Sequence, residues 1–210
     1  MNHKVNSVAN LYSSASNLHR SIVNGSQDTS AAKIMQNLKE GIDNLEQNWE
    51  GHDAGVQINN VVTVYNAMGK IKDVLDELAS EASKISSDYR AIQKANGANN
   101  LEELSRIVPE APSAKIAEYS DTRDTINIQT GAVTGKQKID NANSAIDGFI
   151  ASVKREFDDI MNNWTAGPKR EEAKQVFDEF VANSNKYKQL LNETSESIAT
   201  SMKNYENFEK

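Results

Sequence analysis

The side chains best suited to acid–base chemistry are scattered along this chain. Three histidines are separated by long stretches of sequence: His3, His19 and His52. His52 is followed by Asp53 where a turn is expected, and a solvated pair is the ordinary state of such residues. Asp158 and Asp159 are adjacent, so on a helix they point to different faces and cannot act together as a general acid and base. These residues therefore predict no catalytic pair.

Other residues that could do chemistry also lack the necessary context. The run Gly131–Lys136, Gly-Ala-Val-Thr-Gly-Lys, is one residue shorter than a phosphate-binding loop, lacks the following Ser or Thr, and is expected to follow no buried strand. Cysteine is absent, which excludes disulfides, thiolate metal ligands and a thiol nucleophile. No serine has a Gly-x-Ser-x-Gly context or a histidine partner. We therefore expect a protein that is not an enzyme, with no cofactor and no metal site.

Charge and hydropathy exclude two further classes of function. The 210 residues carry a formal net charge of -7, and basic and acidic residues number 9 and 11 in 1–100, 3 and 6 in 101–124, and 11 and 13 in 125–210. No segment is basic, so nucleic-acid binding is disfavoured. Mean hydropathy is -0.65 and no apolar stretch approaches transmembrane length, so we expect no stable membrane insertion.

Long amphipathic helices are predicted by apolar residues that recur three or four positions apart. This spacing is interrupted near Gly25-Ser26, and only three prolines occur in the chain. The stretches with helical spacing are 5–23, 31–49, 58–89, 126–164 and 168–205. The predicted fold is therefore nearly all α.

One phrase of the sequence occurs twice, and it contains both tryptophans. Trp49-Glu50-Gly51 returns as Trp164-Thr165-Ala166-Gly167, 115 residues later at the tryptophans and 116 later at the glycines. The apolar positions keep an offset of 115 before the tryptophans and 116 after the glycines, so one residue is inserted at this point. A turn tolerates such an insertion, and a packed helix does not. The phrase thus predicts two helix-turn-helix corners, with Gly51 and Gly167 at positive φ and Pro168 beginning a helix.

The repeat divides the chain into two helical hairpins. We expect the first over residues 1–96, a connector over 97–124, and the second over 125–210. The acidic connector is expected to be a solvated linker, with a short helix over 101–108 as one alternative. The two hairpins are expected to pack as an elongated antiparallel four-helix bundle. The connector is long enough for them to pair within one chain or between chains.

The corner and the end of the chain together resemble a known family. Trp49-Glu50-Gly51 lies between two long amphipathic helices, and Tyr205-Glu206-Asn207-Phe208-Glu209 has a tyrosine followed four positions later by an acid. The chain is therefore similar to the WXG, or ESAT-type, helical hairpins exported by the type VII (ESX) secretion system. Two departures exist: the second corner is Trp-x-x-Gly, and Tyr89 is followed at the fourth position by Gln93.

The resemblance implies a non-enzymatic secretion substrate or export partner. Its export signal would be Tyr205 and Glu209, read by the secretion ATPase beside the corner at Trp49. The alternative is a cytoplasmic adaptor that pairs with the helical leader of a larger toxin or with another WXG protein. Because the first residues lack the apolar core of a signal peptide, export without a signal peptide from a cytoplasmic pool is expected. Membrane perturbation, discussed for some members, is a minor alternative.

Each aromatic residue in these motifs also has a purely structural interpretation. An indole at a helix end commonly packs in the core, where truncation to Ala costs about 3–5 kcal/mol. Trp49 and Trp164 therefore serve packing alone, or packing and recognition together. Tyr205 lies in a terminal segment with little core to join, which favours a functional role.

Overall fold

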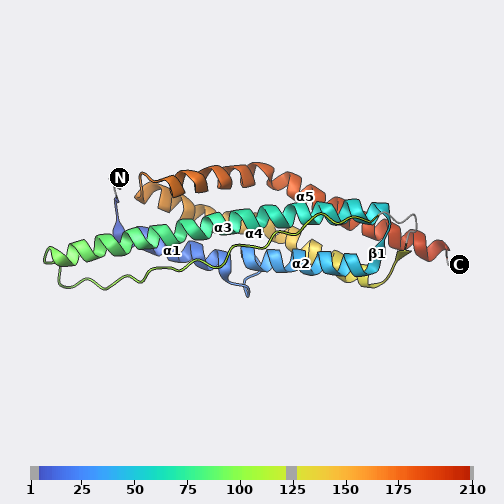
Figure 1. The fold of residues 1–210 in the computed structure, drawn as a ribbon, viewed down its shortest axis with the longest axis horizontal. Coiled ribbons are helices and arrows are strands. Elements are labelled where there is room, and N and C mark those ends of the chain that lie inside the picture. The colour runs from blue at the N-terminus through green and yellow to red at the C-terminus, as the bar shows by residue number, and fades with distance from the viewer. Residues whose placement is uncertain (1–4, 122–126, 209–210) are drawn as a thin grey trace.

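The computed structural model describes residues 5–121 and 127–208, and these are almost entirely helical (Figure 1). The helices are α1 (Val8–Val23), α2 (Ala31–Asn48), α3 (His52–Ala95), α4 (Gly131–Asn163) and α5 (Pro168–Phe208). Two strands of two residues each, β1 (Trp49–Glu50) and β2 (Asn127–Ile128), pair antiparallel. The prediction of an all-α chain is confirmed. Among the described residues, no helix combines the length and the apolar composition needed to cross a membrane.

The first helical stretch is divided where Gly25 and Ser26 predicted an interruption. The hydroxyl of Ser7 accepts a hydrogen bond from the backbone at the start of α1, and that of Ser30 does the same for α2, so each helix has its own N-cap. The loop between them packs on α4, because a Cβ added at Gly148 would lie 2.6 Å from the methyl group of Thr29. α4 itself is continuous.

The helices lie side by side along one long axis (Figure 1). α3 packs against α1, α2 and α5, while α4 packs against α1, α2 and α5 from the other side. Aromatic rings join α4 to α5. The ring centroids of Phe149 and Phe180 are 6.0 Å apart in an edge-on contact, and those of Phe157 and Phe177 are 4.5 Å apart. One continuous core results, and burial of its apolar side chains is the main term that holds the helices together.

α2 and α4 approach each other closely at two glycines. A Cβ added at Gly41 would lie 2.9 Å from a side-chain carbon of Ile139, and one added at Gly135 would lie 3.2 Å from the carbonyl oxygen of Gly41. Any larger residue would push the two helices apart. α4 begins at Gly131, so the run Gly131–Lys136 forms its first turns and is not a phosphate-binding loop.

The connector forms no regular structure over residues 101–121, so the alternative of a short helix over 101–108 is wrong. Figure 1 shows it running back beside α3 toward β1. Hydrogen bonds to α3 fix this path, as described below, and they replace the helical ones. The expected start of the second helical stretch at Ile126, and the boundary between 124 and 125, lie outside the described residues.

Candidate functional site

The first tryptophan ends α2 and begins β1. Its side chain is 1% exposed, so the indole belongs to the core. The backbone of Trp49 pairs antiparallel with Ile128, and the N–H of Gln129 donates to the carbonyl of Asn48 over 2.8 Å. The first corner is therefore closed by the extended residues that precede α4, a contact that the sequence analysis did not predict.

The second tryptophan has the equivalent place between α4 and α5. Trp164 is also 1% exposed, and Val5 forms an antiparallel bridge with it. The N–H of Asn6 donates to the carbonyl of Asn163 over 3.0 Å, as Gln129 does at the first corner. Each tryptophan corner is thus bridged by an extended residue that precedes a helix: Ile128 precedes α4, and Val5 precedes α1.

The two corner glycines have different roles. Gly51 has φ 117°, as predicted, and its N–H donates to the Asp121 carboxylate over 2.9 Å. The prediction of positive φ at Gly167 is wrong. A Cβ there would lie 2.5 Å from the Trp164 ring, so this glycine makes room for the indole instead. Three residues separate α2 from α3 and four separate α4 from α5, so the inserted residue lies in the turn as predicted.

The expected export signal lies only partly within the described residues. Tyr205, near the end of α5, is 36% exposed, whereas Glu209 lies outside the described residues. α5 contacts β2, which pairs with β1, and Figure 1 shows the end of α5 at the same end of the molecule as β1. The structure therefore brings the segment with Tyr205 to the end that holds the Trp49 corner. Trp164 is at the opposite end.

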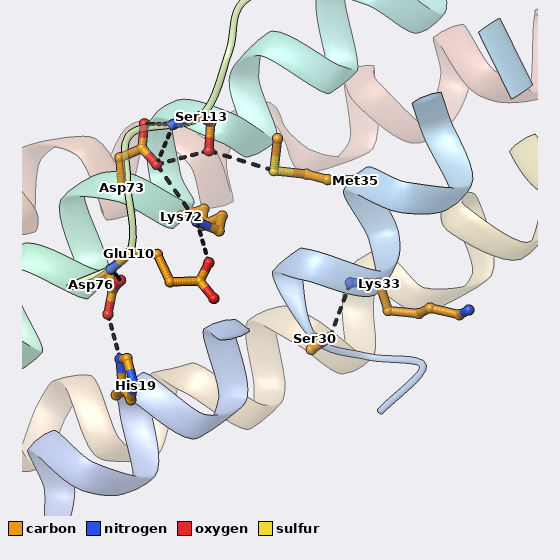
Figure 2. Close-up of polar contacts among 9 residues, drawn as sticks. All are labelled: His19, Ser30, Lys33, Met35, Lys72, Asp73, Asp76, Glu110 and Ser113. Atoms are coloured by element: carbon orange, nitrogen blue, oxygen red, sulfur yellow. Dashed lines mark hydrogen bonds and ion pairs between the residues drawn. The ribbon is translucent and has the colours of Figure 1, made fainter. Parts of the chain in front are cut away.

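A cluster of polar side chains joins α1, α3 and the connector (Figure 2). Asp76 is 2% exposed and uses both carboxylate oxygens. Oδ1 lies 2.6 Å from Nδ1 of His19, and Oδ2 accepts the backbone N–H of Glu110 over 2.8 Å. A buried carboxylate is stable only with such partners, so Asp76 ties the connector to two helices.

A second buried charge lies beside it. The Lys72 side chain is 8% exposed, and its ammonium is 2.9 Å from the Glu110 carboxylate and 3.9 Å from that of Asp73. The Asp73 carboxylate accepts the N–H of Ser113 and, over 2.8 Å, its hydroxyl. The same hydroxyl lies 3.9 Å from the sulfur of Met35. The cluster thus places a residue of the connector against α3 and α2 (Figure 2).

Two asparagines of α3 bind the connector further along. The amide of Asn59 donates to the carbonyl of Tyr119 over 2.9 Å and accepts its N–H over 2.7 Å. Asn66 makes the same pair of bonds with Ile116, at 2.9 and 3.0 Å. Each amide therefore satisfies both backbone groups of one residue, as a neighbouring β-strand would.

Serine hydroxyls continue the series toward the other end of α3. Ser83 accepts the N–H of Ile107 over 2.8 Å, and Ser80 donates to the carbonyl of the same residue over 2.9 Å. We call residues 101–121 the strap. We call six of the α3 side chains that bind its backbone the ladder: Asn59, Asn66, Asp73, Asp76, Ser80 and Ser83. The connector is therefore an anchored segment, and the expectation of a solvated linker is wrong.

The polar side chains of these sites are engaged in hydrogen bonds and ion pairs. Among residues 5–121 and 127–208, no group of three or more His, Asp or Glu could hold a metal ion. The hydroxyl of Ser113 donates to a carboxylate and not to an imidazole. His52 and Asp53 begin α3 rather than lying in a turn, and His3 lies outside the described residues. The ladder, by contrast, satisfies backbone groups of an extended segment residue by residue.

The ladder was not predicted, although the sequence contains a signal for it. Asn59, Asn66 and Asp73 are spaced by seven, which places them on one face of a helix. In the strap, partly buried residues recur at steps of three. They include Leu101, Leu104, Ile107, Ser113, Ile116 and Tyr119. A period of three is typical of neither an α-helix nor a β-strand, so a search for those two periods does not find it.

Comparisons of this chain with protein-family models, with curated proteins and with solved structures found no match.

Proposed function

We propose that this chain is a non-enzymatic substrate or export partner of a type VII secretion system, built from two WXG-like hairpins in tandem. In this proposal α1–α3 is the first hairpin, α4–α5 is the second, and the two pair within one chain as an antiparallel four-helix bundle. The observation that carries the proposal is the reciprocal bridging of the corners, Trp49 by Ile128 and Trp164 by Val5. Reciprocity of this kind is what a pair of related hairpins would make.

The proposed export signal is Tyr205 with Glu209, read by the secretion ATPase beside the Trp49 corner. Exposure supports the choice of Tyr205, because a ring that is 36% exposed is available to a partner. Tyr89, which has the equivalent place at the end of α3, instead packs against the core. Since the indole of Trp49 is buried, it would act by shaping the corner, and the partner would contact the surrounding backbone and exposed side chains.

Export into the culture supernatant tests this proposal. The double variant Tyr205→Ala, Glu209→Ala should lose export while keeping wild-type helix content by circular dichroism and wild-type amounts in the cell. Glu206→Ala is the matched control, since it removes one acid from the same segment outside the proposed signal and should be exported normally. Undiminished export of the folded double variant would refute the proposal.

The alternative of a cytoplasmic adaptor, paired with the helical leader of a larger toxin, would be favoured by a continuous apolar outer face. Among the described residues, large hydrophobic side chains that are more than a third exposed lie on separate elements or far apart on one: Val56, Ile92, Val108, Val133, Val181 and Tyr205. Their distribution favours the substrate over the adaptor. Co-purification of a larger helical protein from the producing cell would reverse that preference.

A further inference from the structure

We propose that the surface of α3 under the strap, which we call the groove, is a binding site for extended polypeptide, and that the strap is its resident ligand. A partner polypeptide whose extended segment has the strap's three-residue pattern would take the strap's place. This inference is independent of the proposed role in secretion, because it rests on the ladder and not on the tryptophan corners or on Tyr205.

The ladder recognises backbone. Asn59 and Asn66 each bind the N–H and the carbonyl of one strap residue, and Ser80 and Ser83 together do so for Ile107. Peptides that add a strand to a sheet edge gain their affinity from the same kind of main-chain hydrogen bonds. Here a helix provides the complementary groups through its side chains. Backbone recognition does not require the ligand to belong to the same chain.

The spacing of the ladder matches that of an extended chain. Asn59, Asn66 and Asp73 are seven residues apart, so each step along α3 is about 10.5 Å. Their partners Tyr119, Ile116 and Ser113 are three residues apart, and three extended residues span about 10 Å. Because the two repeats agree, these three ladder residues meet strap residues that are three apart, and the half-buried state of all three strap residues shows that they face α3 alike.

Side chains in the groove define which peptides fit. Lys72 is buried and pairs with the Glu110 carboxylate over 2.9 Å, so an acid is favoured at that position. Three residues later Ser113 lies over Gly69, where a Cβ on the glycine would be 3.1 Å from that of the serine, so only a small residue fits. An aliphatic and an aromatic residue follow at steps of three, as Ile116 and Tyr119, and both pack against the core. The preferred ligand is therefore Glu-x-x-Ser-x-x-Ile-x-x-Tyr or a close analogue.

The ladder is particular to α3. The positions of α5 that lie 116 residues after Asn59, Asn66 and Asp73 are Gln175, Ala182 and Gln189, and all three are exposed. α5, which no strap covers, therefore has no Asn or Asp at the positions equivalent to the ladder residues Asn59, Asn66 and Asp73. The polar set on α3 is matched to its ligand.

Binding of a free peptide to the full-length chain tests the proposal. The probe is a fluorescein-labelled synthetic peptide of residues 104–121, followed by anisotropy. In the wild type the tethered strap competes at an effective concentration in the millimolar range. The strap variant Ile116→Pro, Tyr119→Pro lacks the two N–H groups that Asn66 and Asn59 bind, so its groove should be vacated. We expect it to bind the peptide at least 100-fold more tightly than the wild type.

Two controls separate recognition by the ladder from general adhesion. The same peptide with proline at both positions should not bind the strap variant. Adding Asn59→Ala and Asn66→Ala to the strap variant should weaken binding of the unmodified peptide by at least tenfold. The proposal would be overturned if the unmodified and the proline-containing peptides bound equally. It would also be overturned if the ladder substitutions left the affinity for the unmodified peptide unchanged.

A milder strap variant guards against loss of folding. Ile116→Ala, Tyr119→Ala removes the two apolar anchors and leaves the backbone intact, so the wild-type peptide should outcompete the weakened strap. If the proline variant loses its helical circular dichroism, this second variant decides the question. Absence of peptide binding to whichever variant is folded would refute a peptide-binding groove.

Discussion

Replacement of Asn66 by alanine tests the energetics of the ladder directly. The side-chain amide makes two hydrogen bonds to Ile116, at 2.9 and 3.0 Å, and each contributes about 0.5–1.5 kcal/mol net. Their loss should therefore destabilise the protein by about 1–3 kcal/mol, toward the lower end because the site is only part-buried. Alanine is the better helix former, which returns up to about 0.7 kcal/mol. The expected decrease in unfolding free energy is therefore about 0.5–2 kcal/mol.

Asn60→Ala is the matched control on the same helix. Its amide accepts no strap backbone group and donates only to the side chain of Gln57 over 3.2 Å, while the gain in helix propensity is the same. Urea denaturation should therefore show Asn66→Ala to be less stable than Asn60→Ala by about 1–3 kcal/mol. Hydrogen exchange of the Ile116 amide should become about 5- to 100-fold faster in Asn66→Ala alone. Equal stability and unchanged exchange at Ile116 would show that the strap does not depend on the ladder.

Four further outcomes follow from the packing. Trp164→Ala should lower the unfolding free energy by about 3–5 kcal/mol in urea denaturation, since the indole is 1% exposed; a loss below about 1 kcal/mol would contradict its place in the core. Gly51→Ala should cost about 1–3 kcal/mol because φ is 117°, whereas Gly25→Ala, with nothing within 4 Å of its added Cβ, should change the melting temperature little; equal effects would refute the argument. The side chain of Lys138 holds the pKa of Glu40 below its usual value, so this pair stabilises the protein above the unfolded pKa and the benefit is lost as pH falls through the lower folded value. Lys138→Met should therefore reduce the melting temperature slightly at pH 7 and not at pH 3, and a difference that persists at pH 3 would exclude the charge as its cause. Light scattering should give a mass near 23.2 kDa, and twice that mass would indicate pairing between chains.

The sequence predicts the helices well because their apolar residues have the helical period. The change of offset from 115 to 116 also places the corner correctly, since Pro168 begins α5 and the extra residue lies between the helices. It fails at Gly167, because the tight packing of the Trp164 ring depends on the tertiary arrangement and the glycine could as well have served a left-handed turn. The backbone bridges at the corners involve two residues or fewer, too short to give a strand pattern.

The path of the strap was not predicted, for a different physical reason. Prolines, asparagines and acidic residues between 97 and 121 have the composition of a solvated segment, and most of the side chains are indeed exposed. What orders the segment is its backbone, bound by side chains of another element. Composition describes the side chains of a segment and not the partners of its N–H and carbonyl groups. A segment that is held only through its backbone is therefore predicted to be a linker.

Length alone does not explain why the connector follows α3. The helix has 44 residues and is therefore about 66 Å long, whereas the 31 residues from 96 to 126 could span about 100 Å when fully extended. A connector longer than the distance it spans could cross the surface by many paths. Restricting it to one path costs conformational entropy. The ladder selects one path by satisfying backbone groups along the strap. The bridges at Trp49 and Trp164 fix the ends of the helices that meet there. α5 lacks the ladder, so α3 and α5 differ in their polar residues although both follow a tryptophan corner. The strap thus distinguishes α3 from α5, as the break between α1 and α2 distinguishes these helices from the continuous α4.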